Sequence, residues 1–261
     1  MINHVERIRD KPRILICVIL DLCPKTVPIF SSFNGLIRLA QHELLKKVII
    51  NSYGDRFYLQ DSESIKIVSP EYEFFVKKYL LLYEGSIFLD VGANIGKYTI
   101  SAAKTVGPNG LVIAIEPDPE NFATLIKNIA LNNLKNVHAL NLAAWNQKDK
   151  LKLFIDSEKG GSSTKTNFKL GYFTVQAISL DEIIHKLNIK RVDCVKIDVE
   201  GAELEVLQGF IDTMNEYGPS IITEIMESDN KRIDHIRTFA KQQKYGLERI
   251  GPDYYLIFPF K

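Results

Sequence analysis

The sequence predicts an α/β fold, a doubly wound and mostly parallel sheet of seven strands with an antiparallel hairpin at its C-terminal end. Three observations support this fold class. Short apolar runs alternate with helical segments from residue 87 onward, a Gly-containing turn joins the first run to its helix, and a Gly-Pro-Asp turn joins the last two runs. Strands that are linked through helices pair in parallel, whereas strands that a tight turn links pair antiparallel.

The composition is that of an ordinary globular protein. The chain has 261 residues, 46% of them hydrophobic, which is enough for a buried core. The 33 basic and 32 acidic residues leave a net charge of +1, which gives no reason to expect a nucleic-acid partner. Cys17, Cys23 and Cys194 show neither disulfide-framework nor zinc-knuckle spacing, so we expect a reducing, cytoplasmic location.

The N-terminal third lacks the regular alternation of the rest. A basic stretch precedes the apolar run 14–20, but Asp21 ends this run, which is too short to span a bilayer and has no cleavage site after it. We therefore favour a packed N-terminal helix or a partner-binding surface over a signal peptide. A helical pattern covers 36–47, and a turn at 53–55 leads into a short strand at 56–60.

These patterns divide the chain into an accessory segment, residues 1–65, and a main domain, residues 66–261. We expect no transmembrane segment, and residues 1–50 would form the contact if the protein is a homodimer. At the start of the main domain, Ser69, Pro70 and Glu71 predict a helix that continues to Gly85.

The elements of the main domain follow from apolar runs and turn residues. Predicted strands of the main sheet are 87–91, 111–115, 136–140, 192–197, 220–225, 246–250 and 254–258. Predicted helices are 95–106, 119–132, one that Ser179 opens, 200–210 and 229–243. Two further strands, 150–155 and 173–178, flank a Gly/Ser-rich stretch at 160–164 that predicts a mobile loop.

The turn after the first strand is the predicted cofactor site. Ligands of open α/β sheets bind outside the carboxyl ends of the strands, and the sequence there reads Asp90-Val91-Gly92-Ala93-Asn94-Ile95-Gly96. Asn94 stands where a dinucleotide fingerprint has glycine, so we expect it to bind a smaller polar group such as an amino-acid carboxylate or ammonium. Thr99 offers a further hydroxyl, while Asp90 either contacts the ligand or holds the turn.

The next two strand ends add candidate cofactor contacts. Glu116 lies twenty residues after Gly96, a position from which a carboxylate accepts hydrogen bonds from both hydroxyls of a ribose. The alternative is that Glu116 only anchors its proline-containing turn. Ala143 and Ala144 leave space for a flat base against the backbone, or they are simply packing residues.

The predicted strand 192–197 leads into candidate catalytic residues. Lys196, Asp198 and Glu200 share one face of a segment that should be apolar on both faces, and such breaks in pattern are expected at functional sites. The structural alternative pairs Lys196 with Asp198 or with Glu224 of the following strand. The five histidines form no ligand spacing, and we predict no metal site; the alternative is a divalent ion held by Asp198 and neighbouring acids, for which no full ligand set is legible. Residues 71–73 either fold over the site or, as we favour, form a plain helix face.

Three motifs together resemble the FkbM-type methyltransferases that depend on S-adenosylmethionine. They are Leu89–Gly96, Glu116-Pro117 and Lys196-Ile197-Asp198-Val199-Glu200-Gly201-Ala202-Glu203, and the resemblance extends over about residues 68–228. It implies a class I methyltransferase fold, S-adenosylmethionine as cofactor and oxygen methylation of sugars or secondary metabolites. It further implies that Gly92, Asn94 and Gly96 line the methionine moiety, that Glu116 holds the ribose, and that Asp198 lies between cofactor and acceptor.

Three hypotheses follow. In the first, the protein methylates a hydroxyl of a small molecule or glycan; Asp198 or Glu200 takes the proton, and Lys196 positions the acceptor or tunes the carboxylates. The second is a nicotinamide-dependent oxidoreductase, against which Asn94 and the terminal hairpin count. The third is a non-catalytic binding module, against which the acids at the strand ends count.

Overall fold

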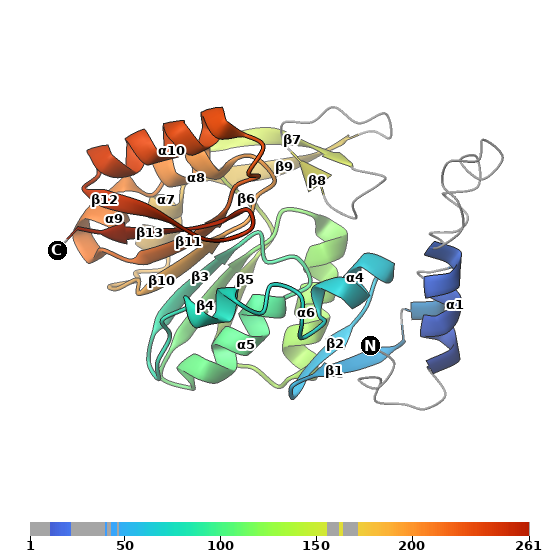
Figure 1. Cartoon of the computed structure of the whole chain (residues 1–261). Coiled ribbons are helices and arrows are strands. Elements are labelled where there is room, and N and C mark those ends of the chain that lie inside the picture. The colour runs from blue at the N-terminus through green and yellow to red at the C-terminus, as the bar shows by residue number, and fades with distance from the viewer. Residues whose placement is uncertain are drawn as a thin grey trace.

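The computed structural model describes residues 11–21, 40, 43–45, 47–155, 162–163 and 172–260. Its main sheet has seven strands in the order β12-β13-β11-β10-β3-β4-β5 (Figure 1). The strands are β3 (Ile87–Val91), β4 (Leu111–Ile115), β5 (Val137–Leu140), β10 (Cys194–Ile197), β11 (Ser220–Glu224), β12 (Tyr245–Gly251) and β13 (Tyr254–Pro259). The predicted strand count and fold class are confirmed.

Pairing in this sheet follows the predicted pattern. Strands β5, β4, β3, β10 and β11 are parallel neighbours, and β13 runs antiparallel to both β11 and β12. In the β3–β10 ladder, Asp90 lies opposite Lys196 and Val91 opposite Ile197. Because parallel strands end at the same edge, the polar residues that follow β3, β4, β10 and β11 are brought together there.

Helices cover both faces of the sheet (Figure 1). One face carries α5 (Lys97–Val106) and α6 (Pro119–Leu131), and the other carries α7 (Leu180–Lys186), α8 (Glu203–Gln208), α9 (Ile211–Tyr217) and α10 (Asn230–Gln242). Alternate residues of a strand point to opposite faces of the sheet. Leu89 and Val91 pack in the core beneath α7 to α10, while Phe88 packs with side chains of α5. By the same alternation Asp90 and Lys196 are directed to the α5 face.

A second, smaller sheet stands beside the first. It has the order β6-β9-β7-β8 and consists of β6 (Ala143–Ala144), β7 (Asp149–Ile155), β8 (Ser162–Ser163) and β9 (Tyr172–Ile178). Both strands predicted in this region are confirmed as β7 and β9. Ser162 and Ser163, predicted as loop, instead form a two-residue strand against β7; the remainder of that predicted loop lies outside the described residues.

The N-terminal segment packs against the main domain. It contains α1 (Lys11–Asp21), the hairpin β1 (Ile49–Ser52) and β2 (Asp55–Tyr58), and α4 (Ser62–Ile67); β1 and α4 were not predicted. Ile14 of α1 and Ile65 of α4 share one apolar cluster with Ile95 and Ile100 of the main domain. The helix predicted at 36–47 lies mostly outside the described residues. Within the described part of the chain, none of the helices has the length and apolarity to cross a bilayer.

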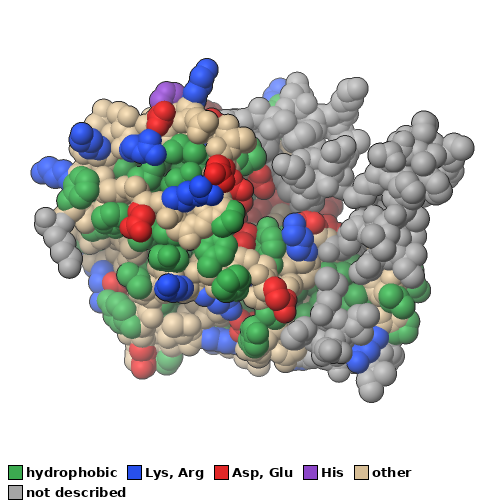
Figure 2. Space-filling model, viewed as in Figure 1, with side chains coloured by type: hydrophobic (Ala, Val, Ile, Leu, Met, Phe, Trp, Pro, Cys, Tyr) green, Lys and Arg blue, Asp and Glu red, His purple; other side chains and the backbone are tan. Residues whose placement is uncertain are grey.

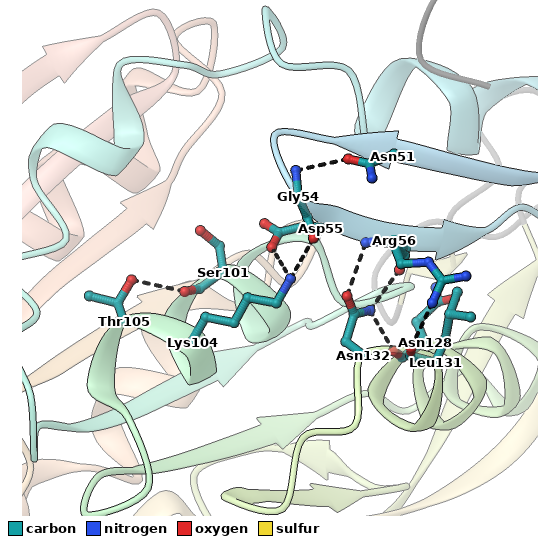
Figure 3. Close-up of polar contacts among 10 residues, drawn as sticks. All are labelled: Asn51, Gly54, Asp55, Arg56, Ser101, Lys104, Thr105, Asn128, Leu131 and Asn132. Atoms are coloured by element: carbon teal, nitrogen blue, oxygen red, sulfur yellow. Dashed lines mark hydrogen bonds and ion pairs between the residues drawn. The ribbon is translucent and has the colours of Figure 1, made fainter. Parts of the chain in front are cut away.

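Polar contacts fasten the β1–β2 hairpin to α5 and α6 (Figure 3). Lys104 Nζ lies 2.7 Å from Asp55 Oδ1, and Asn132 exchanges hydrogen bonds of 3.0 and 2.7 Å with the backbone of Arg56. Asn128, which is fully buried, accepts from the Tyr58 amide and donates to the Ile95 carbonyl at 2.9 Å. The hairpin is therefore connected through Asn128 to the turn that follows β3.

Two predicted helices are wrong in extent. The segment after Pro70 forms turns and a short 3₁₀ helix, η3 (Val76–Lys78), because Glu73 adopts a left-handed conformation (φ 53°) and Phe75 packs on Tyr254. The helix predicted from Glu200 begins at Glu203, since Glu200 (φ 50°) and Gly201 (φ 104°) are also left-handed. Both departures place side chains in the pocket described next.

Candidate active site

A pocket opens at the carboxyl ends of β3, β4, β10 and β11. Figure 2 shows acidic side chains gathered in a hollow near the middle of this face. Six carboxyl groups and two lysines line the pocket, with no arginine among its described lining residues. The charged lining residues are Glu63, Glu73, Lys97, Glu116, Lys196, Asp198, Glu200 and Glu224. The described residues contain no group of three or more His, Cys, Asp or Glu side chains that could hold a metal ion.

The turn after β3 forms the floor of the pocket. Gly92 and Asn94 line it, and both have positive φ values, 81° and 50°. A Cβ atom on Gly92 would lie 1.7 Å from the Asp198 carbonyl oxygen, so only glycine fits where the ends of β3 and β10 meet. The amides of Gly92 and Ala93 are bound by the Ile115 carbonyl, which fixes the turn to the end of β4.

Glu116 connects this turn to the next loop. One of its carboxylate oxygens accepts from the Asn94 amide at 2.7 Å and the other from the Asp118 amide at 2.9 Å. Burial raises the pKa of Glu116 to about 8, although the two backbone donors oppose that shift. A carboxyl group has more acceptor positions than these two bonds use, whether it is ionised or protonated, so the Glu116 side chain keeps acceptor capacity.

Three predicted cofactor residues are not part of the pocket lining. Asp90 and Thr99 lie behind the turn, with side chains 1% and 0% exposed, and Thr99 Oγ1 donates to Asp90 Oδ2 at 2.6 Å. Burial raises the pKa of Asp90, and the nearby Lys196 opposes this. Gly96 (φ 96°) is the N-cap of α5, beneath the side chain of Leu125. Gly92, Asn94, Glu116 and Ala144 do line the pocket.

Lys196 and Asp198 form an ion pair at the end of β10. Lys196 Nζ lies 2.8 Å from Asp198 Oδ2 and 4.6 Å from the centroid of the Tyr98 ring, and only 2% of the lysine side chain is exposed. Burial alone would lower the pKa of Lys196, but Asp198, Asp90 and Glu73 together raise it. The lysine is therefore a fixed cation, and Asp198, 26% exposed, presents the accessible end of the pair.

Glu224 lies beside this pair at the end of β11. Tyr254 donates a hydrogen bond of 3.1 Å to Glu224 Oε2. Burial, followed by the charge of Asp198, raises the pKa of Glu224 well above its usual range, despite the opposing effect of Lys196. Two carboxyl groups on adjacent strand ends are thus unequal: Asp198 is paired with a cation, whereas Glu224 favours the protonated form.

The loop after β10 carries Glu200 into the pocket wall. Glu203, 2% exposed, accepts from the Gly201 amide at 2.7 Å, and its other oxygen lies 3.5 Å from Arg232 Nη1 of α10. Burial raises the pKa of Glu203, while the Gly201 amide and Arg232 oppose that shift. Glu203 thus holds the left-handed turn at Glu200 and Gly201 in place, and α10 supports it.

The turn that precedes η3 forms another wall, in place of the plain helix face that the sequence predicts for residues 71–73. Tyr72 and Glu73 line the pocket together with Lys97 and Tyr98 from the first turn of α5. Tyr98 donates to Glu73 Oε2 at 2.7 Å, and Lys97 Nζ lies 3.8 Å from the same carboxylate. Burial lowers the pKa of Lys97 to about 8, and Glu73 opposes this. The run Gly96-Lys97-Tyr98 at the start of a helix was the available sequence signal for this wall.

Several other lining residues were not predicted. Trp145 follows β6, and Leu153 belongs to β7 of the second sheet; with the predicted Ala144 they form a mostly apolar wall beside the end of β4. Glu63 and Ile67 come from α4, which spans the predicted boundary at residue 65. An Asp61–Ser64 capping box marks the start of α4 and is legible in the sequence.

Comparison with known proteins identifies the family. The Methyltransferase FkbM domain model matches residues 90–247. A fungal relative, Methyltransferase 1 of Beauveria bassiana, is 30% identical over 166 residues, which cover 56% of this chain and 66% of the relative. Hexuronic acid methyltransferase AglP of Haloferax volcanii is 28% identical over 195 residues, 74% of this chain and 79% of AglP.

A solved structure shares the fold. The crystal structure of Methyltransferase FkbM from Methylobacillus flagellatus KT superposes with a TM-score of 0.51 at 20% sequence identity, over 70% of this chain and 46% of that chain. This chain thus spans just under two thirds of the fungal relative and less than half of the bacterial chain. Since the family model covers more than half of the residues, including every strand end that lines the pocket, the chain belongs to the FkbM methyltransferase domain family.

Proposed function

We propose that this chain transfers a methyl group from S-adenosylmethionine to a hydroxyl oxygen of a sugar, glycan or secondary metabolite. One observation carries the proposal: a single pocket joins Glu116, at the end of β4, to Asp198, at the end of β10. The two strands lie on either side of β3, so their ends are two strand spacings apart, about 10 Å. Family membership supports the same activity.

The end of the pocket at β3, β4 and β6 suits the cofactor. We assign the ribose hydroxyls to Glu116, whose carboxyl group retains acceptor positions, and the amino-acid end to the turn that contains Gly92 and Asn94. Ala144, with Trp145 and Leu153, suits a flat, largely apolar base. Asp90, Gly96 and Thr99 would not contact the cofactor; they would stabilise the turn after β3 from the side away from the pocket. When bound, the cofactor supplies an electrophilic methyl group on a cationic sulfur.

The residues at the end of β10 suit the proton transfer. An acceptor hydroxyl becomes a better nucleophile as it loses its proton, and a positioned carboxylate contributes roughly 10²–10⁴-fold to such steps. We assign this role to Asp198, with Glu200 as the alternative base in the same wall. Lys196 fixes the orientation of Asp198 through their 2.8 Å contact. The remaining contribution of the protein is alignment of the two reactants.

The nicotinamide alternative fits less well. Asn94 occupies the position where close approach of a pyrophosphate requires glycine, and the β12–β13 hairpin departs from the all-parallel dinucleotide sheet. Family membership also favours methyl transfer over the nicotinamide reaction and over a non-catalytic module.

Calorimetry with S-adenosylmethionine and S-adenosylhomocysteine tests the proposal. We expect both to bind the wild type, Glu116→Ala to weaken binding at least tenfold, and the control Glu120→Ala, at an exposed position in the first turn of α6, to leave it unchanged. No heat of binding from the folded wild type would refute the function.

A further inference from the structure

Tyr98 lies between the turn that precedes η3 and the ion pair at the end of β10. It is the second residue of α5, its side chain is buried, and it lines the pocket. Its hydroxyl donates to Glu73 Oε2 at 2.7 Å, while Lys196 Nζ lies over its ring, 4.6 Å from the ring centroid. One side chain therefore contacts both the wall that contains Glu73 and the lysine that binds the proposed base.

The Lys196 ammonium has few partners besides this ring. Its side chain is 2% exposed, and among the described residues Nζ donates one side-chain hydrogen bond, to Asp198 Oδ2 at 2.8 Å. Asp90, opposite Lys196 in the ladder, attracts it by charge, but its carboxylate accepts from Thr99. An ammonium has three donors, so one carboxylate oxygen does not fix its position. The face of an aromatic ring attracts a cation, and more strongly where water is excluded, so Tyr98 supplies a second contact.

The ring of Tyr98 is itself held at both ends. Its carbon atoms pack in the apolar cluster that contains Phe88. At the other end, burial, followed by the charge of Glu73, raises the pKa of Tyr98, so the hydroxyl stays protonated and donates to Glu73. A hydrogen bond to a carboxylate is stronger than one between neutral groups, and Glu73 has a further partner in Lys97, 3.8 Å away. These contacts hold the ring in the orientation that places Lys196 over its face.

We propose that Tyr98 is a positioning residue for the proton transfer: its ring holds the Lys196 ammonium against Asp198, and its hydroxyl connects this arrangement to Glu73. The inference rests on the methyl transfer proposed above, in which the hydroxyl proton moves to Asp198 as the oxygen–methyl bond forms and the sulfur–methyl bond breaks. Without the ring, Lys196 and Asp198 would pair in more than one orientation, and fewer bound acceptors would face an aligned base.

Three substitutions separate the ring of Tyr98 from its hydroxyl. Tyr98→Leu removes both, whereas Tyr98→Phe keeps the ring and removes only the bond to Glu73. Tyr98→Met is a second variant without a ring, and it replaces Tyr98→Leu should that variant fail to fold, because methionine adapts to irregular spaces in a core. Tyr83→Phe is the matched control, since Tyr83 also donates to a carboxylate, Asp193 Oδ1 at 3.0 Å, but is not among the described lining residues of the pocket.

Nuclear magnetic resonance of the lysine ammonium groups tests this geometry without any acceptor. Buried, hydrogen-bonded protons exchange slowly with water. We expect the Lys196 ammonium protons, identified by their loss in Lys196→Met, to exchange at least tenfold faster than wild type in Tyr98→Leu and within threefold of wild type in Tyr98→Phe and Tyr83→Phe. An increase below tenfold in Tyr98→Leu, or one above threefold in Tyr98→Phe, would overturn the proposal.

Methyl transfer to a panel of methyl glycosides provides the second arm. We expect Tyr98→Leu to lower kcat at least tenfold and to leave the KM for S-adenosylmethionine within threefold of wild type, because a lost orientation affects the chemical step and not cofactor binding. A smaller fall in kcat, or a larger change in KM, would overturn the positioning role.

Should the wild type methylate no member of the panel, the exchange rates decide alone. Calorimetry on the same samples separates the two proposals. A folded wild type that does not bind S-adenosylhomocysteine refutes the proposed function, whereas the exchange rates refute the role of Tyr98 alone.

Discussion

Lys196→Met is the substitution for which the structure allows the most detailed prediction. Methionine keeps most of the side-chain volume but removes the ammonium that lies 2.8 Å from Asp198 and opposite Asp90 in the β3–β10 ladder. Removing one partner of a buried ion pair costs about 3–5 kcal/mol, because the other charge is left unpaired. Asp198 is 26% exposed and regains some hydration, so we expect a loss of roughly 2–3 kcal/mol in the free energy of unfolding.

The loss should depend on pH. Without Lys196, the folded state binds a proton on Asp90 more tightly than the unfolded state does, because burial already raises the pKa of Asp90 and Lys196 is the largest effect that opposes this. The variant should therefore recover stability as the pH falls from 8 to 5. In the wild type the raised pKa of Lys196 contributes stability that is fully present across this range and is lost only at strongly alkaline pH.

Urea unfolding at pH 8 and pH 5 measures both effects. A loss of this size corresponds to a midpoint shift of about 1 M for an m-value of about 3 kcal/mol/M. Lys231→Met, at an exposed position of α10, is the control and should leave the midpoint unchanged. An unchanged midpoint in Lys196→Met, or a loss that is greater at pH 5 than at pH 8, would refute the reasoning.

Three further predictions follow from the same contacts. Gly92→Ala should lower the free energy of unfolding by several kcal/mol, because its Cβ would lie 1.7 Å from the Asp198 carbonyl oxygen. The control Gly54→Ala, with a similar φ of 88° but nothing within 4 Å of the added Cβ, should cost only about 1 kcal/mol. Equal urea midpoints for the two variants would contradict this prediction. The melting temperature of the wild type should fall as the pH rises from 5 to 8, because the pKa of Glu116 is about 8 in the folded state and lower in the unfolded state. A melting temperature that rises across this pH range would contradict the assignment. Asp198→Asn should leave the affinity for S-adenosylhomocysteine, measured by calorimetry, within about threefold of wild type and lower the rate of methyl transfer roughly 10²–10⁴-fold. Turnover at the wild-type rate in this variant would show that Asp198 takes no part in the chemistry.

The sheet was predictable because its signals are local. Each strand of the main sheet is an apolar run bounded by turn residues, and the Gly-Pro-Asp turn alone implied the antiparallel end, which the β12–β13 pairing confirms. The polar residues at the ends of β4 and β10 could also be predicted from local sequence. Glu116 and Asp198 each come directly after an apolar strand, where a charged side chain breaks the apolar pattern.

The pocket wall that contains Glu73 was less legible because tertiary contacts decide its conformation. Ser69, Pro70 and Glu71 are good helix-start residues, yet Glu73 takes a left-handed conformation, and its carboxylate binds Tyr98 and Lys97 some 25 residues along the chain. No local pattern encodes such a pairing. The same holds for Glu63, which lies in the pocket wall because long-range contacts, among them those of Asn128 and Asn132, fasten the hairpin before α4 to α6.

A crystal structure with S-adenosylhomocysteine tests the central claim most directly. We predict that the ribose hydroxyls lie within hydrogen-bond distance of the Glu116 carboxylate, that the amino-acid end lies on the Gly92–Asn94 turn, and that the sulfur faces Asp198. A ligand whose ribose lies away from Glu116, or whose sulfur faces away from the end of β10, would contradict the account.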